Sequence, residues 1–194
     1  PRLPEEDKKD KFVFLANIHP NLQINVLRQI KRPRLVACDS MNLWIETERK
    51  ELLKLLKEVD LFVLNDSEAR ELTRQSNLAR AARTIRSYGP RMVIIKKGEH
   101  GSLLFFNGRF FSAPAYPLED VYDPTGAGDT FAGGLMGYLA KTEDLSEKNI
   151  RRGIIYGSVM ASFVVEDFSL NRMRSLTSKD IRSRYKEFER LVSF

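Results

Sequence analysis

The feature that most constrains the fold is the alternation of short apolar runs with longer amphipathic stretches in the first half of the chain. The runs are typical of buried strands and comprise Phe12–Ala16, Leu35–Cys38, Leu61–Leu64 and Met92–Ile95. The stretches between them predict helices over Pro20–Ile30 and Glu46–Val59 and along the face Leu78, Ala81, Ala82 and Ile85. Because parallel neighbours need long crossovers, this order predicts a doubly wound, mostly parallel α/β sheet in a three-layer α/β/α arrangement.

The pattern changes after Lys97. Two apolar runs flank Asn107-Gly108, a pair that favours the positive φ angles of a type I′ turn, so an antiparallel hairpin over Leu103–Phe106 and Arg109–Ser112 is expected. From Thr125 onward the chain is predicted to be mostly helical, over Gly126–Ala140, Glu147–Val165 and Ser178–Val192.

Composition limits the class of protein. The 194 residues carry 32 Lys and Arg against 26 Asp and Glu, and 42% are hydrophobic, which describes an ordinary folded domain rather than a disordered chain. No apolar stretch is long enough to span a bilayer and Pro1–Lys11 is charged rather than signal-like, so we expect a cytoplasmic protein without a membrane partner. Basic and acidic residues are interleaved, so no nucleic-acid partner is expected despite the net charge of +6.

Few soft metal ligands are present. Cys38 is the single cysteine, which excludes an internal disulfide and a multi-thiolate zinc site, and His19 and His100 are the two histidines. Any metal must therefore be held by oxygen atoms.

The segment Asp123–Gly134 is the most informative about chemistry. Gly126, Ala127 and Gly128 open a predicted helix with almost no side chain, so unpaired N–H groups and the positive end of the helix dipole can face an anion. Asp129 lies in the first turn, where its carboxylate can accept a proton from an attacking hydroxyl. A base beside an anion hole suits phosphoryl transfer. The alternative is a glycine-rich helix start packed on a strand, with Asp129 as a capping acid.

Asp123-Pro124-Thr125-Gly126-Ala127-Gly128-Asp129-Thr130-Phe131-Ala132-Gly133-Gly134 closely resembles the C-terminal motif of the ribokinase-like (PfkB) carbohydrate kinase family. The resemblance implies that Asp129 is the catalytic base, that residues 126–128 form the anion hole, and that ATP is the phosphoryl donor. It also implies a monovalent cation, K⁺, beside Asp123 and Thr125.

Two other segments fit the same resemblance. Asn65-Asp66-Ser67-Glu68 looks like the family's Asn-x-x-Glu motif, in which Asn65 and Glu68 would position Mg²⁺ through water; the alternative is an ordinary helix cap. The segment Ile95–Gly101 resembles the family's strand and turn at the nucleotide phosphates, with Lys96, Lys97, Gly98 and Gly101 as contacts. In isolation, an ordinary tight turn is the favoured interpretation of that segment.

Two turns are assigned by position alone. Glu166 and Asp167 fall where the family builds its adenine pocket, and a core helix with a polar turn is the alternative. Asp39-Ser40-Met41-Asn42 follows a strand at the carboxyl edge, where it can face a ligand, although a capping turn is favoured.

The resemblance covers nearly the whole chain but not the whole family pattern, because the early strands, the lid and the paired-glycine sugar motif are missing. We therefore expect residues 1–194 to be a single ribokinase-like domain without its N-terminal lid and sugar-binding portion, inactive by itself, from a parent protein that can form a homodimer. The expected activity is ATP-dependent phosphorylation of a sugar hydroxyl. The alternatives are a nucleoside (adenosine-type) kinase and a non-catalytic nucleotide-binding module; a nucleic-acid binder would rest only on the charge.

Overall fold

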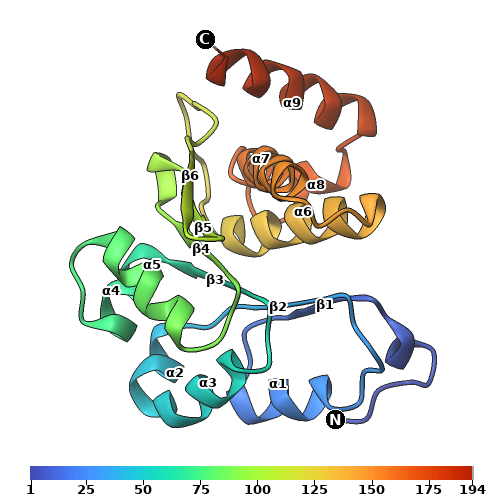
Figure 1. Cartoon of the computed structure of the whole chain (residues 1–194). Coiled ribbons are helices and arrows are strands. Elements are labelled where there is room, and N and C mark those ends of the chain that lie inside the picture. The colour runs from blue at the N-terminus through green and yellow to red at the C-terminus, as the bar shows by residue number, and fades with distance from the viewer. Residues whose placement is uncertain (194) are drawn as a thin grey trace. The chain divides into compact units, whose positions relative to one another are not determined.

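The four apolar runs form neighbouring parallel strands in the computed structural model, which describes residues 1–193 (Figure 1). The six strands are β1 (Phe12–Leu15), β2 (Leu35–Cys38), β3 (Leu61–Asn65), β4 (Met92–Lys96), β5 (Ser102–Phe106) and β6 (Arg109–Ala113). They lie in one sheet in the order β1-β2-β3-β4-β5-β6. The mostly parallel α/β sheet expected from the sequence is confirmed.

The chain divides into two compact units. The first contains residues 1–97 and 103–111, and the second contains residues 98–102 and the described part of 112–194. The predicted site residues are divided between them, with Asn65, Glu68, Lys96 and Lys97 in the first unit and the others in the second.

The crossover helices of the first unit pack on one face of the sheet. They are α1 (Pro20–Leu27), α2 (Asn42–Thr47), α3 (Arg49–Leu56), α4 (Asp66–Thr73) and α5 (Leu78–Ser87). Their apolar side chains share one core cluster with alternate strand residues such as Val36, Cys38, Phe62 and Leu64. The intervening strand residues are also buried, as an inner layer of a fold requires.

The six described strands follow one another across the sheet in sequence order. Right-handed crossovers between successive neighbours therefore place α1–α5 on the same side. Hydrophobic periodicity reports burial on both faces but carries no information about strand order.

The hairpin between β5 and β6 agrees with its prediction. Asn107 and Gly108 have φ angles of 49° and 76°, which is the pair of left-handed residues that a type I′ turn requires.

The second unit is mainly helical, with α6 (Ala127–Thr142), α7 (Glu147–Val164), α8 (Asn171–Arg174) and α9 (Ser178–Val192). The helices α6 and α7 approach closely because glycines line their contact: a Cβ on Gly157 would lie 2.7 Å from the Phe131 carbonyl oxygen, and one on Gly134 would lie 2.8 Å from Met160 Cγ. Tyrosines from α6, α7 and α9 stack in series, since the rings of Tyr138 and Tyr185 each lie 4.4 Å from that of Tyr156.

One predicted helix is divided. Instead of a single helix over 46–59, α2 and α3 meet at Glu48, whose φ of −124° and ψ of 29° lie outside the helical region. The Glu48 carboxylate lies 3.5 Å from His19 Nε2, so this residue faces the start of α1 instead of continuing the helix.

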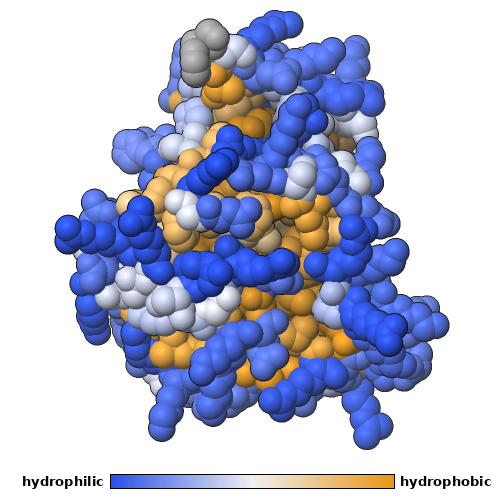
Figure 2. Space-filling view, in the orientation of Figure 1, coloured by the Kyte–Doolittle hydropathy of each residue, from blue (hydrophilic) through white to orange (hydrophobic). Residues whose placement is uncertain are grey.

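The described surface is mixed in character. Figure 2 shows hydrophilic side chains over most of the visible face, with apolar side chains between them. Among residues 1–193, no helix is both long and apolar enough to cross a lipid bilayer.

Candidate functional site

In the first unit, the carboxyl ends of β3 and β4 bring two predicted site residues together. Asn65 and Lys96 are partners in the parallel register, so they leave the sheet side by side. Glu68 lies in the first turn of α4, and its carboxylate accepts the Asn65 N–H. The structure thus places Asn65, Glu68 and Lys96 at one edge, where open α/β sheets bind ligands.

Asn65 and Glu68 also form a capping box. The Asn65 side chain accepts the Glu68 N–H at 2.8 Å, and Glu68 Oε2 accepts the Asn65 N–H at 2.8 Å. The structure therefore shows the helix cap. These two side chains could contact a ligand only through donor and acceptor positions that the cap does not use. Burial raises the pKa of the Glu68 carboxyl, while the hydrogen bond from Asn65 and the charge of Lys96 act in the opposite direction.

The segment Asp39–Asn42 leads from β2 into α2 and is tied to its neighbours. Asp39 and Ser40 are both 8% exposed, and the Asp39 carbonyl accepts a hydrogen bond from the buried Gln23 amide at 3.3 Å. Asn42 Nδ2 donates to the Glu71 carboxylate on α4. The sequence favours a capping turn for this segment. In the structure the segment leads directly into α2, a helix that sequence periodicity did not show.

In the second unit, the predicted phosphate turn is a single 3₁₀ turn over Gly98–His100. The Gly101 N–H donates to the Gly98 carbonyl at 3.0 Å, and both glycines have positive φ angles, 57° at Gly98 and 79° at Gly101. A Cβ on Gly101 would lie 2.0 Å from the Ala113 carbonyl oxygen, whereas one on Gly98 would meet nothing within 4 Å. Gly101 therefore allows the backbone at Ala113 to pack closely against the turn, whereas the space beside Gly98 is open.

The glycine-rich start of α6 has the geometry of an anion site. Gly126 is its N-cap, with a φ of 79° and no capping side chain. The Ala127 N–H donates to the Pro124 carbonyl at 3.2 Å, whereas the N–H groups of Gly128 and Asp129 have no hydrogen-bond partner within residues 1–193. Asp129 is exposed in the first turn. Unpaired donors and an exposed carboxylate thus lie on the same turn of one helix.

Asp123 shapes the turn that leads into this helix. Its Oδ1 atom accepts the Thr125 N–H at 2.9 Å, and its Oδ2 atom accepts the Ser169 N–H at 3.4 Å. The hydrogen bonds from Thr125 lower the pKa of the Asp123 carboxyl, so it stays ionised at neutral pH. The monovalent-cation site beside Asp123 and Thr125 stays a prediction.

Glu166 and Asp167, the residues predicted near the adenine, follow α7. Glu166 is held by two arginines, with Arg184 Nη2 2.5 Å from Oε1 and Arg172 Nε 3.1 Å from Oε2. Asp167 Oδ1 accepts the Phe168 N–H at 2.6 Å. The Phe168 ring beside them is 62% exposed. Sequence reasoning missed Arg172 on α8 and Arg184 on α9, because both helices carry other charged residues and nothing in their patterns singles out these two.

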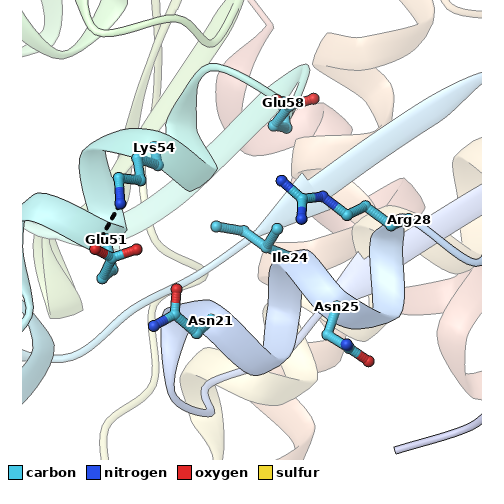
Figure 3. A pocket seen from close by; sticks show the side chains of 7 residues that line it. All are labelled: Asn21, Ile24, Asn25, Arg28, Glu51, Lys54 and Glu58. Carbon is cyan, nitrogen blue, oxygen red and sulfur yellow. Dashed lines mark hydrogen bonds and ion pairs between the residues drawn. The ribbon is translucent and has the colours of Figure 1, made fainter.

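A separate surface hollow of about 280 Å³ lies between α1 and α3 (Figure 3). Its lining is mostly polar, and on the α3 side Lys54 and Glu51 form an ion pair of 2.7 Å. The lining residues are Asn21, Ile24, Asn25, Arg28, Glu51, Lys54 and Glu58. None of them is a predicted site residue.

The described residues contain no group of three or more His, Cys, Asp or Glu side chains that could hold a metal ion directly. The oxygens at the β3 edge therefore fit a hydrated magnesium ion contacted through water, and they do not fit a dehydrated one surrounded by protein ligands. Asn65 Oδ1 already accepts hydrogen bonds from Ser67 and Glu68, which leaves the Glu68 carboxylate as the better contact for bound water.

Residues 11–175 match the pfkB family carbohydrate kinase profile, which covers most of the chain. The chain belongs to the pfkB family. The ribokinase-like resemblance inferred from Asp123–Gly134 is thereby confirmed.

Relatives within the pfkB family include kinases of two substrate classes. A cytidine kinase of Thermococcus kodakarensis is 33% identical over 150 residues, which are 75% of this chain and 53% of that protein. A nucleoside kinase of Methanocaldococcus jannaschii is 28% identical over 158 residues, covering 80% of this chain and 49% of that one. Fructokinase-2 of Zea mays is 27% identical over 116 residues, covering 58% and 34% respectively. The chain thus spans about half the length of these archaeal relatives.

Solved structures support the fold. The crystal structure of the Methanocaldococcus jannaschii nucleoside kinase, an archaeal member of the ribokinase family, superposes with a TM-score of 0.73 at 22% identity, over 91% of this chain and 56% of that one. The described chain therefore has the ribokinase-like α/β fold.

Proposed function

We propose that this chain is the nucleotide-binding and catalytic part of an ATP-dependent kinase that phosphorylates a hydroxyl of a nucleoside. The main sequence-based expectation was a sugar acceptor, with a nucleoside as the alternative. The cytidine and nucleoside kinases among the relatives favour the alternative, because they share more identity and more of their length with this chain than the plant fructokinase does. A sugar remains the second candidate acceptor.

The observation that carries the proposal is the first turn of α6, which combines unpaired N–H donors with the exposed Asp129 carboxylate. In the proposed step, the acceptor hydroxyl oxygen attacks the γ-phosphorus of ATP, and the bond from that phosphorus to the β,γ-bridging oxygen breaks. The hydroxyl proton passes to Asp129, and ADP leaves with the bridging oxygen. The N–H groups stabilise the negative charge on the transferring phosphoryl oxygens.

Magnesium, when bound, would neutralise charge on the phosphate oxygens of ATP. The residues proposed to contact it through water are Asn65 and Glu68, and Lys96 and Lys97 supply positive charge near the same strand end. K⁺ is proposed beside Asp123 and Thr125. Glycines 98 and 101 are proposed to let the backbone approach the phosphates.

We further propose that residues 1–194 form one ribokinase-like domain and that the lid and most of the acceptor site belong to the portion of the relatives this chain does not match. That portion is about half of the cytidine kinase. A kinase without a closing element admits water and holds its acceptor poorly, so the chain alone is expected to bind nucleotide better than it turns over.

The chain is expected to bind ADP with Mg²⁺ weakly, with a Kd on the order of 10⁻⁴ M, and to show little phosphoryl transfer. Titration followed by NMR measures the first property. A coupled ADP-release assay over matched panels of nucleosides and sugars measures the second, both for this chain and for the protein as its gene encodes it. Nucleoside-dependent ADP release by the encoded protein supports the proposed substrate class. Release only with sugars would select the second candidate, and absence of ADP binding would refute the nucleotide site.

Replacement Glu68→Gln is expected to raise the magnesium concentration required for half-maximal activity by about tenfold, because the lost charge no longer orients the hydration shell of the metal. Gln keeps an oxygen that can accept the Asn65 N–H, so the cap and the fold are retained. Magnesium titrations of activity in the encoded protein provide the measurement, with Glu71→Gln, on the same helix, as the control. Equal magnesium dependence in both variants would leave Glu68 with its capping role alone.

A further inference from the structure

The segment that follows α7, residues 165–170, is joined to the turn that precedes α6. The Val165 carbonyl accepts the Tyr122 N–H at 2.8 Å and the Asp123 N–H at 3.4 Å. In the other direction, Asp123 Oδ2 accepts the Ser169 N–H at 3.4 Å. Because Asp123 also accepts the Thr125 N–H, residues 165–170 support the backbone that leads into the glycine-rich start of α6.

This segment is anchored in turn by Glu166. Each of its carboxylate oxygens has its own arginine, Arg184 on α9 and Arg172 on α8. A carboxylate held at both oxygens by planar donors has a fixed direction as well as a fixed position. Glu166 therefore acts as an anchor for residues 165–170, and its carboxylate is already engaged before any nucleotide arrives.

Arg184 is itself held from several sides. Its Nη1 atom donates to Ser162 Oγ at 3.1 Å, and its guanidinium carbon lies 3.5 Å from the centre of the Phe163 ring and 4.9 Å from that of Tyr116. Its side chain is only 16% exposed. A guanidinium packed against aromatic rings, hydrogen-bonded at Nη1 and ion-paired at Nη2 has little freedom to turn, so it couples the position of Glu166 to that of α9.

We propose that Arg184 is a positioning residue which, through Glu166, keeps residues 165–170 and Asp123 in the arrangement that binds nucleoside diphosphate at the start of α6. The inference rests on the proposed function of that helix start as a phosphate site. It assigns to α9, the last helix of the chain, a role in nucleotide affinity. It assigns Glu166 to the support of the site instead of direct contact with the adenine.

The test compares the unaltered chain with Arg184→Met, which keeps an unbranched apolar stem but removes the donors and the charge, and with Glu166→Gln, which is nearly isosteric. Arg190→Met is the matched control, since Arg190 is exposed on the same helix. The first readout is amide hydrogen exchange without ligand. Arg184→Met and Glu166→Gln are expected to speed exchange at the Tyr122 and Ser169 amides about tenfold, while the Val159 amide in the adjacent core is unchanged. A general loss of stability would speed all three.

The second readout is the Kd for ADP with Mg²⁺, which is expected to rise about tenfold in both variants and to rise no further in the double variant, because both residues act through one contact. Arg184→Lys should recover part of the affinity, since an ammonium can reach one Glu166 oxygen but cannot reproduce the planar contacts. Unchanged exchange at Tyr122 and Ser169 would refute the anchor. Faster exchange with normal ADP affinity would refute its positioning role. Absence of ADP binding by the unaltered chain would instead refute the proposed nucleotide site.

Discussion

Replacement Asp129→Asn is expected to reduce turnover of the encoded protein by about 10²–10⁴-fold while the Kd for ADP changes by less than about twofold. Asparagine has nearly the same shape, and the N–H groups at the start of α6 are unaffected, so phosphate binding should persist. Only the acceptance of the hydroxyl proton is lost. Single-turnover kinetics with ATP and the preferred acceptor, together with an ADP titration, separate the two quantities.

Asp120→Asn is the appropriate control for this experiment, because Asp120 is an exposed carboxylate in the loop before Asp123. It should leave both turnover and ADP affinity unchanged. Near-normal turnover in Asp129→Asn would contradict the assignment of Asp129 as the base and would favour its alternative role as a first-turn capping acid.

The second large effect concerns stability. Gly101→Ala is expected to lower the free energy of unfolding by about 2–5 kcal/mol, because it combines a disfavoured φ with a clash against backbone. The added Cβ would lie 2.0 Å from the Ala113 carbonyl oxygen and 2.4 Å from the Pro114 carbonyl carbon, and neither can yield as a flexible side chain could. Urea denaturation followed by far-UV circular dichroism measures the change.

Gly98→Ala supplies an internal control from the same turn. Its φ of 57° is also positive, but the space around it is open, so the expected cost is only the backbone component of about 1–2 kcal/mol. The difference between the two variants isolates the steric contribution. Equal losses would show that the turn opens to accommodate a Cβ at Gly101.

Strands and long helices were predictable because their signals are local. Strands β2 and β3 are buried on both faces and so appear as continuous apolar runs, and the start of α9 coincides with a capping box between Thr177 and Asp180. Helix α2 was not predictable, because Ile45 is its one buried residue and Leu43 is 45% exposed, which leaves no apolar stripe. The order of the strands across the sheet was also not predictable, since hydrophobic periodicity does not encode it.

The residues of the candidate site also divide into those with a local sequence signal and those without one. Asp129 and the glycines before it could be proposed from one continuous segment whose residue types suit phosphoryl transfer. The hydrogen bond between Asp123 and Ser169 and the ion pair between Glu166 and Arg184 could not, because each joins residues that are far apart in the sequence. Glu68 is an intermediate case, because the spacing predicted both of its candidate roles and the structure shows one of them, the capping box with Asn65.

The close contact between α6 and α7 has a consequence for motion. Gly134, Gly153 and Gly157 bring each helix close to atoms of the other, so sliding α6 along α7 would push side chains into backbone. We therefore expect α6 and α7 to move together as one rigid body. Any displacement of Asp129 during a reaction cycle must then carry α7 with it. Spin labels placed on the exposed residues Ala140 and Arg152 should keep a constant separation whether or not ADP is bound.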